Sequence, residues 1–279
     1  MKKPVIGFIG GGNMTQSLIS ALLESGLEAN QIWVSDTHEE KLSHLSLQFG
    51  VQTDRSNQKV TEHAEVLILA VKPQDMHTVA KELKVYLNDI PTSEQPLFIS
   101  IAAGIHANVL ARWLNTSAGI VRAMPNTPAL LRAGATGLYA NAQVTETQRN
   151  LAESLLRAVG ITVWVNHEHD MDTVTALSGS GPAYFFLMME ALQQAAETLG
   201  LTNPIARLLT LQTALGAARM ALESDINLAE LRKRVASPGG TTECALSALE
   251  TGGIRDLFKK ALVSAKERSV EISALLDKE

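Results

Sequence analysis

The sequence lacks the features of three protein classes. Its 279 residues include a single cysteine, Cys244, so no intrachain disulfide can form, which fits a reducing compartment. No apolar stretch approaches the roughly 20 residues that span a bilayer, and Met1-Lys2-Lys3 leads into a short apolar run without a secretory signal. A net charge of −5 offers no basic surface for nucleic acid. We therefore expect a cytoplasmic protein with no membrane and no nucleic-acid partner.

Aromatic residues are also scarce, at 4% of the chain, whereas hydrophobic residues make up 46%. The core must therefore be aliphatic and rich in alanine. A chain of 279 residues exceeds a typical single domain. Strand-like apolar runs alternate with helical patterns up to about residue 165, and after Asn166 only helical patterns remain. This organisation predicts an α/β fold, with a Rossmann-like doubly wound sheet in residues 1–165 followed by an all-α domain in residues 166–279.

The individual elements follow from the spacing of apolar residues. Apolar runs predict strands at residues 5–9, 31–35, 66–71, 97–101, 118–123 and 161–165. Helical spacing predicts two helices that stop at Gly26 and Gly50, and others over about 76–87, 106–114, 145–158, 184–199, 205–222 and 241–251. The helix at 145 opens with Thr145-Glu146-Thr147-Gln148, which is a capping-box sequence.

Three glycines, Gly10-Gly11-Gly12, join the first strand to the first helix. Between a strand and a helix, this pattern is typical of a dinucleotide-binding turn. Gly10 would permit the tight turn, and Gly12 would let a pyrophosphate approach the backbone at the positive end of the helix. The third position is Thr15 rather than Gly or Ala, so we expect looser packing of strand and helix there. A purely structural turn is the alternative, and a later acidic residue favours dinucleotide binding.

That acidic residue is Asp36, which ends the second apolar run at about the expected distance. A carboxylate there usually accepts hydrogen bonds from the adenosine ribose and repels a 2′-phosphate, which argues for NAD over NADP. No Arg follows it closely, whereas Thr37 and His38 do. Alternatively, Asp36 is the N-cap of a helix that begins at Glu39, and one residue can serve both purposes.

Other strand ends carry residues toward the same edge of the expected sheet, where open parallel sheets bind their ligands. Lys72-Pro73 terminates the run Val66–Val71, and Met124-Pro125-Asn126-Thr127-Pro128 forms a rigid, non-helical loop. The small residues Ala102-Ala103-Gly104 leave room for something to approach. For Lys72 alone, an ordinary loop with a solvated lysine is an equally good interpretation.

The helix expected at 205–222 is apolar or small nearly all round. A helix without a wide polar face is buried. The helical part has only about 115 residues with which to bury it, so we predict that the helix packs against another subunit. A monomeric bundle with this helix at its centre is the alternative.

Two polar segments interrupt the helical part, Ser178–Pro182 and Ser237–Thr242. The glycines of the second expose backbone N–H groups beside hydroxyls, and the dipole of the following helix favours a carboxylate. Thr241 acting only as a helix cap is an equal alternative. Adjacent positions such as His167-Glu168-His169-Asp170 rarely converge on one ion, so we expect no metal. Ser180 lacks the G-x-S-x-G frame of a hydrolase.

Five motifs together resemble the pyrroline-5-carboxylate reductase family, and the resemblance spans the whole chain. The last two are the most specific of the five: Gly7–Met14, Ala70–Pro73, Met124–Pro128, Leu177–Tyr184 and Ser237–Thr242. The resemblance implies hydride transfer from NADPH or NADH to a small cyclic imine carboxylate, the last step of proline synthesis. It also implies a helical dimerisation domain that interlocks with its twin in a homodimer, often assembled further into a decamer.

The resemblance further implies site residues. The cofactor would contact Asn57, Pro125 and Asn126, and two segments, Ile9-Gly10-Gly11-Gly12-Asn13-Met14 and Ala70-Val71-Lys72-Pro73. Ser237, Thr241 and Thr242 would hold the substrate, with the Thr242 hydroxyl near the imine nitrogen. Thr15 replaces the usual Ala, and Asp36 stands where NADPH-preferring members carry small polar and basic residues. The second departure leaves the preference between NADH and NADPH open.

On this interpretation, the N–H groups of Gly240, Thr241 and Thr242 orient the substrate carboxylate. An iminium carbon is already electrophilic, so no strong catalytic acid is required, and Thr242 would hydrogen-bond the nitrogen and accept or relay its proton. A β-hydroxyacid dehydrogenase is a second interpretation, with Lys233, in a charged run typical of a solvated face, as its nearest catalytic lysine. A nucleotide-sensing regulator is a third, and it would need no carboxylate pocket.

Overall fold

The computed structural model describes residues 3–277, which form two compact units. The first unit runs to Ser180 and takes in the chain again from Ala265, and the second comprises Gly181–Ser264. This division differs from the boundary predicted at residue 165, because residues 166–180 and the end of the last helix pack with the sheet. A buried hydrogen bond of 2.7 Å from the Ser269 hydroxyl to the Asp172 carboxylate is one such contact.

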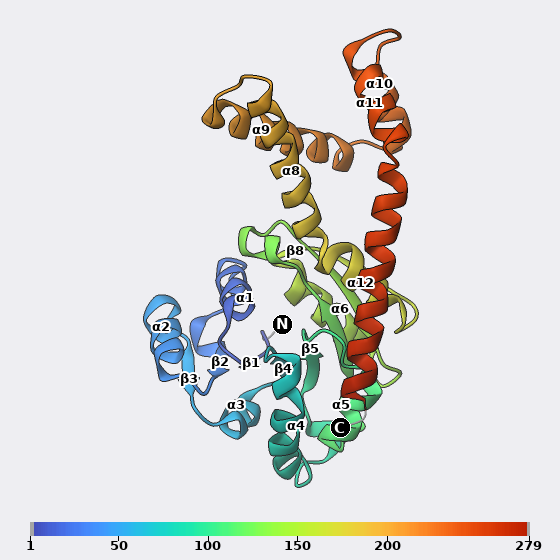
Figure 1. The fold of residues 1–279 in the computed structure, drawn as a ribbon. Helices are drawn as coiled ribbons and strands as arrows, with labels where there is room; N and C mark the ends of the chain where they lie inside the picture. The colour runs from blue at the N-terminus through green and yellow to red at the C-terminus, as the bar shows by residue number, and fades with distance from the viewer. Residues whose placement is uncertain (1–2, 278–279) are drawn as a thin grey trace. The chain divides into compact units, whose positions relative to one another are not determined.

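The first unit is built on one sheet with the strand order β3-β2-β1-β4-β5-β6-β7-β8 (Figure 1). All neighbouring strands pair in parallel except β6 and β7, which are antiparallel. The first six strands have the order of a dinucleotide-binding doubly wound sheet, so the predicted fold class is confirmed. The strands are β1 Ile6–Ile9, β2 Ile32–Ser35, β3 Gln52–Asp54, β4 Val66–Leu69, β5 Leu97–Ser100, β6 Ile120–Met124, β7 Gly134–Ala140 and β8 Gly160–Trp164.

Helices cover both faces of this sheet, because successive strand residues point to opposite sides. Ile68 of β4 packs in one core cluster, whereas Leu67 and Leu69 pack in the other. The first cluster holds apolar residues of α1 (Asn13–Glu24), α2 (Glu39–Phe49) and α6 (Glu146–Arg157). The second holds residues of α3 (Asn57–His63), α4 (Pro73–Leu87) and α5 (Ala107–Leu114). After β8, the chain passes through α7 (Asp170–Val174) and one π-helical turn, Thr175–Gly179.

The second unit is entirely helical. Its helices are α8 (Gly181–Thr198), α9 (Asn203–Leu222), α10 (Leu228–Val235), α11 (Thr241–Thr251) and the first part of α12 (Ile254–Leu276). Helices α8 and α9 pack on one another (Figure 1), yet many of their large apolar side chains stay exposed. Phe186 is 63% exposed, Leu208 67% and Leu215 62%. Within residues 3–277, no helix is both long and apolar enough to cross a membrane.

Candidate cofactor and substrate sites

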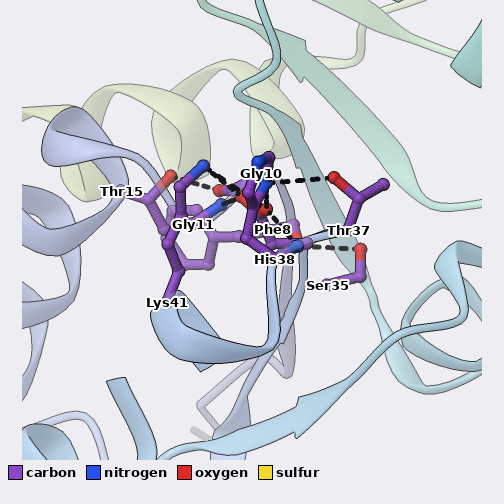
Figure 2. A network of polar contacts seen from close by, with 9 residues as sticks. Phe8, Gly10, Gly11, Thr15, Ser35, Thr37, His38 and Lys41 are labelled. Carbon is purple, nitrogen blue, oxygen red and sulfur yellow. Dashed lines mark hydrogen bonds and ion pairs between the residues drawn. The ribbon is translucent and has the colours of Figure 1, made fainter. Parts of the chain in front are cut away.

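The turn between β1 and α1 has room for no side chain at its first glycine. Gly10 has φ of +105°, and a Cβ built there would lie 2.7 Å from the carbonyl oxygen of Ala70. Its N–H donates to the Ser35 carbonyl at 2.7 Å, which holds the turn against the end of β2 (Figure 2). This position therefore requires glycine, as the motif predicts.

Thr15 is buried beneath this turn, and its hydroxyl donates to the Gly10 carbonyl at 2.6 Å (Figure 2). The larger side chain at the third motif position is therefore accommodated by a hydrogen bond. Because that bond ties α1 to the turn, the expected loosening of strand and helix has no support in these contacts.

Gly12 differs from the other glycines of the turn because a Cβ added to it would meet no atom within 4 Å. It is the N-cap residue of α1, no side chain caps this helix, and its first turn carries no acidic residue. Backbone N–H groups at the positive end of a helix bind phosphate. The open space beside Gly12 and the uncapped helix end therefore fit the pyrophosphate of a dinucleotide.

The Asp36 carboxylate lies next to the glycine turn and is only 8% exposed. Its Oδ2 accepts from the Gly11 N–H at 2.8 Å and from the Lys41 ammonium at 3.1 Å, and its Oδ1 accepts from the His38 N–H and ring Nδ1, both at 2.9 Å. Burial alone would raise the pKa of Asp36, but the hydrogen bonds outweigh it and lower the pKa from 3.8 to about 2. The carboxylate is thus ionised at any working pH.

The structure also decides the capping role suggested for Asp36. Helix α2 is capped by His38, and no side chain accepts its first N–H groups. Asp36 is therefore not the N-cap of α2, and that alternative is wrong. Its Oδ1 instead accepts from the His38 N–H, and this hydrogen bond stabilises the turn that leads into α2.

Asn57 lies at the same edge of the sheet, at the first residue of α3 and just after β3. Its side-chain oxygen accepts from the Ser35 hydroxyl at 2.7 Å, and its amide donates to Glu82 at 2.9 Å. Nothing in the local sequence signalled this residue, because only the family resemblance pointed to it. The bond to Ser35 places it beside the end of β2.

The segments that follow β4 and β6 complete this edge. The Ala70 N–H donates to the Ile9 carbonyl at 2.8 Å, and Lys72 and Pro73 form the N-cap and first residue of α4. Asn126, just after β6, donates to the Ser178 carbonyl at 3.0 Å and accepts from the Ala135 N–H at 2.9 Å. Because β1, β2, β4 and β6 run the same way, the sheet gathers the predicted cofactor residues at its carboxyl edge.

Two other segments singled out in the sequence, Ala102–Gly104 and His167–Asp170, make structural contacts within the first unit. The room left by Ala102-Ala103-Gly104 is taken by α12, because a Cβ on Gly104 would lie 2.9 Å from Ile272 Cγ2. Glu168 accepts from Arg122 at 2.9 Å and from the Ala107 N–H at 2.6 Å. Among the described residues, no three His, Cys, Asp or Glu side chains gather as a metal site.

The first of the two polar segments, Ser178–Pro182, packs on the end of β6. A Cβ on Gly179 would lie 2.5 Å from Met124 Cε, so this glycine allows the close approach. The Ser178 hydroxyl donates to the Val174 carbonyl at 3.0 Å. Within the first unit, this segment therefore supports the loop that carries Asn126.

The second segment, Ser237–Thr242, forms a tight turn before α11. Gly239 has φ of +70°, and Gly240 is the N-cap of α11 without any side-chain cap. The alternative in which Thr241 caps the helix is therefore wrong. The Gly240 N–H donates to the Ser237 carbonyl at 3.0 Å, so it is already engaged in the turn.

A carboxylate from the same helix already binds at this turn. Glu243, in the first turn of α11, accepts from the Gly239 N–H through Oε2 at 2.6 Å. This bond is a local contact between the first turn of the helix and the residue before its N-cap, and it leaves the N–H groups of Thr241 and Thr242 without a side-chain cap. Lys233, the lysine that a β-hydroxyacid dehydrogenase would need, lies exposed on α10 in the charged run of that helix.

Two protein-family profiles match the chain. Residues 5–104 match the family described as NADP oxidoreductase, coenzyme F420-dependent. Residues 168–272 match the family described as pyrroline-5-carboxylate reductase dimerisation. The first match contains the glycine turn and Asp36, and the second contains the turn before α11. The dimerisation match indicates that the protein forms a homo-oligomer.

Full-length relatives agree with these matches. The pyrroline-5-carboxylate reductase of Pseudomonas aeruginosa is 48% identical over 276 residues, which cover 99% of this chain and 99% of that protein. A solved pyrroline-5-carboxylate reductase from Coxiella burnetii has a TM-score of 0.92 at 48% identity and covers 98% of this chain and 99% of its own. The Plasmodium falciparum pyrroline carboxylate reductase, solved with NADP bound, has a TM-score of 0.85 at 28% identity, with 98% and 99% coverage.

Proposed function

The chain belongs to the pyrroline-5-carboxylate reductase family, and we propose that it reduces 1-pyrroline-5-carboxylate to L-proline with a hydride from NADPH or NADH. The family resemblance of the five motifs is thereby confirmed. The observation that carries the proposal is the 48% identity to a reductase of this name over 99% of both chains. The reaction adds a hydride to the imine carbon and leaves a secondary amine at the nitrogen.

The first unit supplies the cofactor site in this proposal. The N-terminus of α1 and the space beside Gly12 would hold the pyrophosphate, because no side chain of the protein caps that helix. Asp36 and Asn57 would lie toward the adenosine, and Pro125 and Asn126 toward the nicotinamide. When bound, the reduced nicotinamide supplies the hydride, and the protein's task is to orient it.

The turn before α11 would hold the substrate carboxylate. Thr241 and Thr242 are the first residues of the helix, so their N–H groups are free to donate, and Ser237 would add its hydroxyl. The Gly240 N–H is not available to the substrate, since it donates to the Ser237 carbonyl within the turn. This narrows the donors expected from the sequence to Thr241 and Thr242.

Thr242 is the group proposed to act on the substrate nitrogen. A hydroxyl both donates and accepts hydrogen bonds, so Thr242 can accept from the N–H of the protonated imine and orient it. Hydride addition to that iminium gives the neutral secondary amine, and the hydroxyl can then relay to its nitrogen the proton that completes the ammonium of proline. A hydroxyl has no charge to lose near neutral pH. It therefore acts by position, and the electrophilicity comes from the iminium itself.

We propose that the homo-oligomer is a dimer formed through the helical unit, assembled further into a decamer. Support comes from the exposed apolar faces of α8 and α9, which one chain leaves uncovered. Sedimentation of the purified protein measures the size of the assembly directly.

We also propose a cytoplasmic location, because Cys244 is a free, exposed thiol.

The test of the function is a spectrophotometric assay with purified protein. Loss of reduced-nicotinamide absorbance on addition of 1-pyrroline-5-carboxylate, matched mole for mole by proline, is the expected result. A protein that binds nucleotide but consumes neither NADH nor NADPH with this substrate would contradict the proposal. A β-hydroxyacid tested with the oxidised cofactors serves as the negative control.

A further inference from the structure

The immediate surroundings of Asp36 address which of the two cofactors the protein takes. In this fold, the residue after the second strand faces the adenosine ribose. A carboxylate alone there repels the 2′-phosphate that distinguishes NADPH from NADH. In this chain, however, Asp36 lies between the glycine turn and two basic side chains, those of His38 and Lys41.

The Asp36 carboxylate has little capacity left for a ribose. A carboxylate offers about four lone-pair positions. Gly11 and Lys41 fill those of Oδ2, and the His38 N–H and ring fill those of Oδ1. The two backbone donors are fixed by the turn and by the start of α2. A ribose hydroxyl can therefore bind Asp36 only when the side chain of Lys41 or His38 leaves it.

These two side chains are also the accessible part of the cluster. Lys41 is 43% exposed and His38 is 67% exposed, whereas Asp36 is 8% exposed. Figure 2 shows Lys41 and His38 beside the glycine turn, and the Thr37 hydroxyl lies 3.1 Å from the His38 ring Nδ1. A ligand that reaches this edge meets the ammonium, the imidazole and the Thr37 hydroxyl before it meets the carboxylate.

The local charge makes the Lys41 ammonium decisive for a phosphate. The Asp36 and Lys41 charges offset one another at 3.1 Å. Glu39 and Glu40 in the first turn of α2 add negative charge, which disfavours a phosphate, and the uncapped helix end favours one. A 2′-phosphate is therefore held here only if the Lys41 ammonium turns to it, since the His38 ring Nδ1 already contacts Asp36 at 2.9 Å and the Thr37 hydroxyl at 3.1 Å.

We propose that Lys41 is the residue that selects between the cofactors, by exchanging Asp36 for the 2′-phosphate of NADPH. With NADH, the Asp36 carboxylate accepts from the ribose hydroxyls in place of the displaced side chain. With NADPH, the Lys41 ammonium binds the phosphate while Gly11 and His38 keep Asp36 in place. The protein then accepts both cofactors. This inference rests on the proposed cofactor site at the same edge of the sheet.

Calorimetric binding tests the inference without the reaction. The ligands are NAD⁺, NADP⁺ and their adenosine fragments, 5′-AMP and 2′,5′-ADP, titrated into wild type, Lys41→Gln and Lys41→Arg. Lys59→Gln is the matched control, because Lys59 also pairs with an aspartate, Asp54, at 2.7 Å and is 54% exposed. Lys41→Gln should weaken NADP⁺ and 2′,5′-ADP about tenfold, as expected for one charge-assisted hydrogen bond.

In the same experiment, NAD⁺ and 5′-AMP should bind Lys41→Gln within about twofold of wild type or more tightly, because Asp36 is freed. Lys41→Arg should keep the phosphate ligands, and Lys59→Gln should leave all four ligands unchanged. Equal changes for phosphorylated and unphosphorylated ligands, or no change for either, would overturn the role of Lys41 while leaving the cofactor site intact. A wild-type protein that binds none of the four would overturn the cofactor site as well.

Discussion

Helices α1 and α11 each have a glycine as N-cap and no side-chain cap, yet they differ in what surrounds them. The turn before α1 is held by its own unit, because Ser35, Thr15 and Asp36 bond to its backbone and Ala70 packs on Gly10. In the described part of its unit, the turn before α11 is held by its own residues and by Glu243 in the first turn of that helix. Ser237 accepts from Gly240, and Glu243 accepts from Gly239. No side-chain atom outside the turn lies within 4 Å of a Cβ added at Gly239.

We infer from these contacts that the α1 turn is a preformed site, whereas the α11 turn is not completed by its own unit. The α1 turn sits at the edge of a packed sheet, so its N–H groups point to one place whether or not a ligand is bound. The α11 turn lies on exposed helices, and the carboxylate that it binds is its own. We therefore expect mutations at the α1 turn to act on nucleotide binding, and on folding as well where they disturb its packing. Mutations at the α11 turn should act on substrate binding or turnover and leave nucleotide binding unchanged.

Gly10→Ala should have the largest effect. The new Cβ would meet the Ala70 carbonyl at 2.7 Å, and φ of +105° is strained for alanine. Together these should cost more than about 3 kcal/mol of unfolding free energy and abolish nucleotide binding. Urea unfolding and NADP⁺ titration measure both.

Gly12→Ala is the matched control for Gly10→Ala, because the φ of Gly12 is −76° and the new Cβ would enter open space. It should leave stability within about 0.5 kcal/mol but weaken nucleotide binding, since the methyl group enters the pyrophosphate position. Equal losses of stability in the two variants would break the comparison.

Thr242→Ala should have the next largest effect, and on turnover only. Loss of the hydroxyl that positions the substrate nitrogen should lower kcat about a hundredfold, with nucleotide binding and unfolding unchanged. Thr242→Ser should recover most of the rate, and Thr251→Ala at the other end of α11 should be neutral. A Thr242→Ala enzyme with full turnover would remove the proposed role.

Asp36→Asn should lose about 2 kcal/mol of stability at neutral pH, because the folded protein lowers the pKa of Asp36 from 3.8 to about 2. A lowered pKa stabilises the fold above the unfolded value and ceases to do so as pH falls through the folded value. The gap between wild type and variant in urea unfolding should therefore close between about pH 4 and about pH 2. A gap that stays constant over that range would show that the charge of Asp36 is not its cause.

Glu243→Gln should have the smallest effect. The Glu243 carboxylate accepts from the Gly239 N–H at 2.6 Å, next to the Thr241 and Thr242 N–H groups proposed for the substrate. Removing its negative charge lowers the repulsion of the substrate carboxylate, so KM should fall about two- to threefold with kcat unchanged. Glu230→Gln, on the neighbouring helix α10, controls for the change of net charge. A raised KM would mean that Glu243 shapes the substrate site rather than competing with the substrate.

The sequence predicted what depends on local patterns. Helix α6 begins with the expected capping box, in which the Thr145 hydroxyl accepts from the Gln148 N–H at 3.2 Å. The buried strands were predicted because their apolar runs are continuous. Strand β7 was not predicted, because its residues Gly134–Ala140 include two glycines and no such run. Its glycines are needed for close approach, since a Cβ on Gly137 would lie 2.4 Å from Val174.

The contacts that shape the candidate sites could not be predicted from local sequence patterns, because they join residues of different elements. Asp36 was expected to face a ribose, but its bonds to Gly11 and Lys41 depend on how β2 and α2 meet the turn. The hydrogen bond from the Gly239 N–H to the Glu243 carboxylate depends on the geometry of the turn before α11. The return of α12 to the sheet unit rests on contacts such as Ser269 with Asp172, which lie 97 residues apart.

The most direct test is a crystal structure of the assembled protein with NADP⁺ and proline. The account predicts the proline carboxylate on the N–H groups of Thr241 and Thr242, with its ring carbon facing the nicotinamide bound at the glycine turn. If the turn before α11 faces bulk solvent in every subunit while both ligands bind elsewhere, the account is wrong.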